Sequence, residues 1–216
     1  MRFGWRPKVS YDTSMKPQLI VEQKITPFVN KYAVYRATPA GDKGPLVAFA
    51  QQERFKFKEK VLFYGEEGKT NLVFSFRAEK VMDIHGRYFV EDGDGQLVGC
   101  FRKEFTKSLL ASTWTILDTN DTPVFTVTET DQLLAGFRRY VGYIPFIGEF
   151  ADIVMAFFRY HFKFVQISTG NQVGTYQKMT LFRDHYKLLM NDDAYAAQDW
   201  RVLAAMAVAL DALQSR

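Results

Sequence analysis

The stretch that decides the fold is Val202-Leu-Ala-Ala-Met-Ala-Val-Ala-Leu210, which carries no polar residue on any side. Residues 194–213 include no Gly or Pro and are rich in strong helix formers, so they predict a helix. A helix that is apolar all round must be buried all round, and we therefore expect the remaining chain to enclose it. Asp199 and Arg201 before the stretch, and Asp211 after it, argue against a membrane-spanning helix.

Pairs of strands separated by turn residues fill much of the chain before that helix. Gly, Asn and Asp occupy the turns, and β-branched or aromatic residues flank them, which is typical of β-hairpins. The abundance of aromatic residues, with 20 Phe, 11 Tyr and 3 Trp, also favours strands. The expected strand pairs are 32–36 with 46–51, 88–90 with 97–101, 113–117 with 123–128, and 164–167 with 173–176.

The economical arrangement of these elements is a sheet that curls around the helix. A closed barrel leaves no exposed strand edges, which a long meander would otherwise present. The alanines of the helix would let the surrounding strands come close. We expect an all-β dominated fold with a central helix, as one domain over 18–216, preceded by an N-terminal arm over 1–17.

One apolar segment, at 140–160, breaks the strand rhythm. Its large apolar residues recur at helical spacing opposite a narrow charged face, so the pattern predicts an amphipathic helix inserted into the barrel sequence. This face could lie in a membrane interface, plug one end of the barrel, or contact a protein partner or a second copy. The residues expected to make membrane or partner contact are Ile147, Phe150, Val154, Phe157 and Phe158.

The segment 54–61 alternates basic with mostly apolar residues. Because alternate residues of a strand share one face, its cations would form a row of positive potential. Such a row suits lipid headgroups or another polyanion, with about 1 kcal/mol from each basic residue near an anionic surface. The alternative is a solvated outer face whose lysines discourage edge pairing. The candidate lipid- or anion-binding residues are Arg54, Lys56, Lys58 and Lys60.

Sequence patterns for catalysis and metal binding are missing. Cys100 lies in an apolar alternating run and is expected to pack as a small hydrophobic residue. Asp92 and Asp94 resemble the start of a calcium loop, but its twelfth position is Lys103, so we expect a hairpin turn. The three histidines are far apart, which argues against a zinc site. Without a Gly-x-Ser-x-Gly elbow, phosphate loop or dinucleotide fingerprint, we expect no catalytic residues, no enzyme activity and no cofactor.

Charge and cysteine content bound the cellular setting. The net charge of +4 permits attraction to anionic partners without indicating nucleic acid. A single cysteine allows no internal disulfide and suits a reducing compartment. The first residues lack the apolar region of a secretory signal. We therefore expect a cytoplasmic protein that can be peripheral at a membrane.

Six segments in a characteristic order mark the chain. They are 29–32 (Val-Asn-Lys-Tyr), 74–78 (Phe-Ser-Phe-Arg-Ala), 88–92 (Tyr-Phe-Val-Glu-Asp), 109–114 (Leu-Leu-Ala-Ser-Thr-Trp), 160–164 (Tyr-His-Phe-Lys-Phe) and the closing apolar helix at 199–213. In this order they resemble the Tubby C-terminal-like superfamily, which includes the LURP-one-related proteins and the phospholipid scramblases. The resemblance implies an antiparallel barrel of twelve strands threaded by the C-terminal helix.

The resemblance also implies a functional theme of membranes and phosphoinositides. Together with the cationic row, it leads us to expect a non-enzymatic binding module for anionic lipid headgroups or a membrane surface. The alternative is a structural or interaction domain that dimerises or binds a protein partner through the insertion at 140–160. Binding of a small ligand inside the barrel is disfavoured, because the helix should fill the interior.

Overall fold

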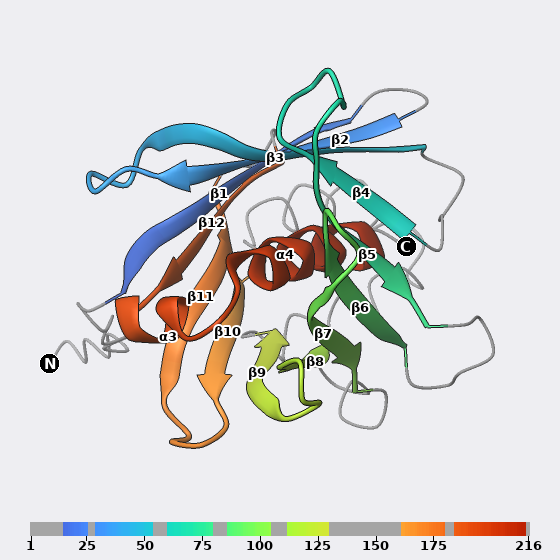
Figure 1. The fold of residues 1–216 in the computed structure, drawn as a ribbon. Coiled ribbons are helices and arrows are strands. Elements are labelled where there is room, and N and C mark those ends of the chain that lie inside the picture. The colour runs from blue at the N-terminus through green and yellow to red at the C-terminus, as the bar shows by residue number, and fades with distance from the viewer. Residues whose placement is uncertain are drawn as a thin grey trace, which may run out of the picture.

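The protein is a closed barrel of antiparallel strands with one helix running through its interior (Figure 1). The computed structural model describes residues 15–25, 29–53, 60–79, 86–104, 112–129, 161–179 and 184–214. The strands are β1 (Lys16–Ile25), β2 (Val29–Ala37), β3 (Lys43–Glu53), β4 (Lys60–Tyr64), β5 (Leu72–Ala78), β6 (Arg87–Asp92), β7 (Leu97–Lys103), β8 (Thr113–Leu117), β9 (Pro123–Glu129), β10 (His161–Gln166), β11 (Gln172–Lys178) and β12 (Asp184–Met190). The helices are α3 (Asp192–Ala196) and α4 (Trp200–Gln214).

Each strand pairs with its neighbours in the sequence, and the ring closes where the first strand pairs with the last. This closing ladder joins β1 to β12, from Lys16 opposite Met190 to Gln23 opposite Asp184. Complete closure leaves no free sheet edge, as the barrel prediction required. The fold class expected from the sequence is therefore confirmed, including the twelve strands that the resemblance implied.

Helix α4 fills the barrel. Each residue from Val202 to Leu210 is at most 1% exposed, so the helix is enclosed on every side, as its composition predicted. Inward-facing aromatic rings of the wall pack around it. Phe63 stacks on Phe74 with ring centroids 4.2 Å apart, and Phe74 meets the edge of Trp200 at the start of α4.

The C-terminal helix is interrupted, which corrects the expectation of one helix over 194–213. Asn191 caps α3 by accepting a hydrogen bond from the Ala194 amide. The chain then turns, and Asp199 starts α4 by accepting a hydrogen bond from the Arg201 amide. A short polar side chain that bonds nearby amides offers the backbone an alternative to a continuous helix.

The strand predictions hold where the structure describes the chain. All four predicted hairpins are present, as β2–β3, β6–β7, β8–β9 and β10–β11. Strand β1 begins at Lys16, two residues inside the expected arm, and residues 1–14 lie outside the described part. The predicted helix at 140–160 also lies outside it.

Candidate anion-binding face

The antiparallel topology sorts the connections between strands onto two ends of the barrel. Consecutive antiparallel strands run in opposite directions, so alternate connections lie at opposite ends. We call one end the turn end; it holds α3 and the connections 38–42, 65–71, 93–96, 118–122 and 167–171. We call the other end the loop end; the connections that leave and re-enter the strands there are 26–28, 54–59, 79–86, 104–112, 130–160 and 179–183.

The sequences of the two sets of connections differ in charge and in apolar content. The loop-end connections hold nine Lys or Arg and seven Asp or Glu, whereas the turn-end connections hold one Lys and six Asp or Glu. Large apolar residues (Val, Ile, Leu, Met, Phe, Tyr or Trp) make up 28 of the 62 loop-end positions but only Ile167 of the 26 turn-end positions. In sequence, the connections attached to the turn end are therefore polar and acidic, and those attached to the loop end are rich in apolar residues with an excess of cations.

Both sequence-predicted contact regions belong to loop-end connections. Lys60 is the first residue of β4 and is exposed on the outer face, while the next residue, Val61, is buried in the core. This part of the predicted alternation is thus seen in the structure. Arg54, Lys56 and Lys58 lie outside the described residues, in the connection that leads into β4. The predicted contact residues of the insertion also lie outside them: Ile147, Phe150, Val154, Phe157 and Phe158.

The structure adds to Lys60 three cations that no local sequence pattern marks. Lys60 lies directly opposite Arg77 on β5, and Arg87 on β6 lies directly opposite Arg102 on β7. All four side chains belong to the outer face, because their strand neighbours Val61, Phe76, Tyr88 and Phe101 pack into the core. Each also lies in the half of its strand nearer the loop end. We call Lys60, Arg77, Arg87 and Arg102 the cation belt.

Like charges directly opposite each other destabilise a sheet, so the cation belt needs compensation. Arg87 forms an ion pair with Asp121, and Arg102 Nε donates a hydrogen bond to Glu104 Oε1 at 3.0 Å. Glu91 serves Lys60 and Arg77 together. Among the described residues, three carboxylates thus face these four cations, which leaves one positive charge in excess. One of the three, Asp121, belongs to the turn-end connection 118–122, so Arg87 extends over the outer face toward that end.

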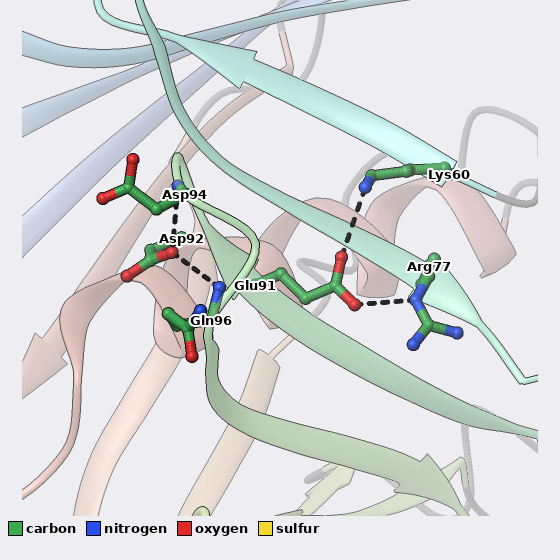
Figure 2. A network of polar contacts seen from close by, with 6 residues as sticks. All are labelled: Lys60, Arg77, Glu91, Asp92, Asp94 and Gln96. Carbon is green, nitrogen blue, oxygen red and sulfur yellow. Dashed lines mark hydrogen bonds and ion pairs between the residues drawn. The ribbon is translucent and has the colours of Figure 1, made fainter.

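Glu91 is the shared partner of the first pair, as Figure 2 shows. Its carboxylate accepts a hydrogen bond from Arg77 Nε at 2.8 Å and one from Lys60 Nζ at 3.2 Å. The bond from Arg77 lowers the pKa of the Glu91 carboxyl; partial burial opposes this, and the bond from Lys60 adds to it. Glu91 is therefore ionised at neutral pH and holds both cations close to the sheet.

A single aromatic ring orients two of the arginines. The guanidinium carbons of Arg77 and Arg87 each lie 5.2 Å from the ring centroid of Phe89, in the range of cation–π attraction. Arg87 also reaches Cys100 Sγ, at 3.5 Å, over the outer face of β7. Cys100 is buried, as expected, but it lies beneath this arginine on the outer face.

The Asp92–Asp94 segment forms the hairpin turn that the sequence predicted. Asp92 Oδ1 accepts hydrogen bonds from the amides of Asp94 and Gln96, so this side chain shapes its own turn (Figure 2). In the described part of the chain, no group of three or more His, Cys, Asp or Glu side chains could hold a metal ion. Neither described helix has the length and apolar character needed to cross a bilayer.

The chain is similar to a known protein family over most of its length. A family model described as LURP-one-related matches residues 46–211, which is more than half of the chain. The match runs from within β3 into α4 and includes every residue of the cation belt together with Glu91. No curated protein gives a significant match.

Proposed function

The chain belongs to the LURP-one-related family of the Tubby-like superfamily, and on that premise we propose that it is a non-enzymatic binding domain for anionic membrane surfaces. The superfamily suggests a domain that binds lipid or protein. Our proposal is that the ligand is a layer of anionic lipid headgroups, phosphoinositides among them, met at the cytoplasmic face. The loop end makes the contact.

The observation that carries this proposal is the contrast between the two ends of the barrel. A protein that lies on a membrane needs cations for the headgroups and apolar side chains for the interface. The loop-end connections combine both, with 28 large apolar residues and an excess of Lys and Arg. The turn-end connections are acidic and nearly devoid of large apolar residues, so an anionic surface repels that end.

The basic segment adds to the attraction at the loop end. Arg54, Lys56 and Lys58 precede Lys60, the first residue of β4, in the sequence, so the chain tethers them close to the cation belt. Each basic residue near an anionic surface contributes about 1 kcal/mol within a Debye length. These three cations and the net charge of the belt would act on the same surface.

The insertion is the apolar partner of these cations in the proposal. It joins Glu129 at the end of β9 to His161 at the start of β10, both at the loop end. Its predicted apolar face would enter the interface while the cations contact headgroups, which is the usual division in interfacial helices. Contact of the same face with a protein partner or a second copy is the competing role.

Vesicle co-sedimentation tests the proposal. We expect the protein to sediment more with vesicles of phosphatidylcholine and phosphatidylserine than with phosphatidylcholine alone. Replacing Arg54, Lys56 and Lys58 by Gln should weaken binding to the anionic vesicles on the order of 100-fold. The matched control replaces the three turn-end lysines Lys16, Lys43 and Lys69 by Gln, which removes the same charge and should have little effect.

Three outcomes would contradict the proposal. Equal sedimentation with neutral and anionic vesicles, unchanged in the loop-end variant, would remove the electrostatic contact. Equal losses in the loop-end variant and its control would mean that net charge matters and not the end that carries it. If neither kind of vesicle binds and light scattering shows association that grows with concentration, the insertion serves a protein interface instead.

A further inference from the structure

Glu91 holds its two cations although it is itself largely covered. Its side chain is 14% exposed, compared with 44% for Lys60 and 46% for Arg77. Arg77 uses Nε for this bond, and Figure 2 shows its two terminal nitrogens turned away from the carboxylate. The cations therefore stay accessible to solvent while part of their hydrogen-bonding capacity is taken by a carboxylate of the same sheet.

The backbone next to Glu91 is fixed by contacts of the β6–β7 turn that involve neither cation. The next residue, Asp92, fixes the β6–β7 turn through the amides of Asp94 and Gln96, and its own amide donates to the Gln96 carbonyl. Gly93 lies so close to β5 that an added Cβ would be 2.4 Å from the Leu72 carbonyl oxygen. Glu91 is thus held at a fixed place, and the longer side chains of Lys60 and Arg77 come to it.

We propose that Glu91 is a built-in competitor for the anionic ligand of the cation belt, and that it sets how dense in negative charge a surface must be to bind. This inference rests on the proposed function, because it concerns the same face. The ligand chemistry is that of anionic phospholipid headgroups, which would draw Lys60 and Arg77 away from Glu91.

Glu91 and an incoming anion compete because both would neutralise the same two cations, Lys60 and Arg77. An isolated monoanion that takes the place of Glu91 exchanges one negative partner for another. It also leaves a partly buried carboxylate without its cations, which is unfavourable. A dense layer of headgroups offers Lys60 and Arg77 separate partners, and its potential acts on the whole belt. The wild-type face therefore discriminates against sparse anions and favours dense ones.

The variant Glu91→Gln tests this inference, since it keeps the shape of the side chain and removes its charge. We expect its partition onto vesicles of phosphatidylcholine and phosphatidylserine to rise about fivefold, as for one additional positive charge near the surface. The gain should be largest at low phosphatidylserine content. The matched control is Asp192→Asn, which removes the carboxylate partner of Lys16 at the turn end and should leave the partition unchanged.

The outcomes separate this inference from the proposed function. If wild type does not distinguish anionic from neutral vesicles, the proposed function fails. If wild type prefers anionic vesicles and Glu91→Gln binds equally well or less well, Glu91 orders the cations for binding, and only the competitor role is overturned. A gain that is equal in Asp192→Asn would assign the effect to net charge and would also overturn it.

Two further measurements serve as controls, one for folding of the variants and one for binding of a soluble anion. Circular dichroism establishes that each variant is folded. If Glu91→Gln unfolds, Glu91→Asp replaces it, because the shorter side chain keeps the charge but moves it away from both cations. The partition of Glu91→Asp onto the vesicles should then rise by a smaller factor. Inorganic phosphate serves as the soluble anion. A melting temperature of Glu91→Gln that rises with phosphate, without any gain on vesicles, would show a site for free phosphate and overturn the assignment to headgroups.

Discussion

Gly99 in the barrel wall and Val202 in the central helix approach so closely that no side chain fits between them. A Cβ added to Gly99 would lie 2.9 Å from Val202 Cγ2 and 3.1 Å from the Leu117 carbonyl oxygen. The φ of Gly99 is also +150°, a value that favours glycine. The backbone of β7 at Gly99 thus packs directly against the Val202 side chain of α4, and this contact limits the distance between the helix and the wall.

Replacing Gly99 by Ala should therefore destabilise the protein strongly. Steric overlap with α4 and an unfavourable φ act together, and we expect the free energy of unfolding in urea to fall by about 3 kcal/mol. The control is Gly68→Ala, where the nearest atom to the new Cβ would be Glu66 Cγ at 3.7 Å, an ordinary contact. Similar losses in the two variants would contradict the close approach at Gly99.

Arg36 on β2 connects the barrel wall to both helices. Its guanidinium donates a hydrogen bond to Tyr195 Oη at 2.7 Å and lies 5.2 Å from the Trp200 ring centroid. In a double-mutant cycle with Arg36→Gln and Tyr195→Phe, we expect a coupling of about 1 kcal/mol in the free energy of unfolding. Additive losses would mean that the hydrogen bond contributes nothing to stability.

Stability should depend on pH through Glu91. Because Arg77 and Lys60 lower the pKa of its carboxyl in the folded state, the ionised form stabilises the fold. That contribution is complete above the ordinary value of 4.5 and is lost as the pH falls through the lower folded value. Urea unfolding from about pH 5 downward should show a steeper loss for wild type than for Glu91→Gln. Parallel pH profiles would remove Glu91 as a source of the acid sensitivity.

The alanines of α4 should tolerate no enlargement. Ala207 is 1% exposed inside the closed wall, so Ala207→Leu would force the strands or the helix to move. We expect a loss of about 1–3 kcal/mol in the free energy of unfolding. The matched control is Ala196→Leu on the exposed side of α3, which should change stability little. A neutral Ala207→Leu would indicate unfilled space beside α4.

The sequence predicted the barrel and its central helix because both depend on local patterns. The apolar run Val202–Leu210 permits no solvated face, and the four hairpins are marked by their turn residues. The break before α4 was missed because Gln198 and Asp199 do not exclude a helix by themselves. The capping hydrogen bond that the Arg201 amide donates to Asp199 Oδ1 distinguishes the two arrangements.

The cation belt depends on strand register, which residue patterns alone do not determine. Lys60 was singled out from the alternation that precedes it, whereas Arg77 and Glu91 carry no comparable local signal. They meet because β4, β5 and β6 pair in particular registers, which bring Lys60 opposite Arg77 and Glu91 opposite Ser75. A one-residue slip in either ladder would turn one of these side chains toward the core.

The pairing of β1 with β12 dictates when the protein can fold during its synthesis. Strand β1 pairs with a strand that is translated much later, since Lys16 lies opposite Met190, 174 residues further along the chain. The helix that fills the interior follows β12 in the sequence. Until α4 has been made, the core-facing apolar side chains of the earlier strands have no helix to pack against. The nascent chain therefore exposes them to neighbouring polypeptides. Folding therefore cannot be completed before α4 has been synthesised, and we expect the long-range closure to be slower than the formation of any hairpin.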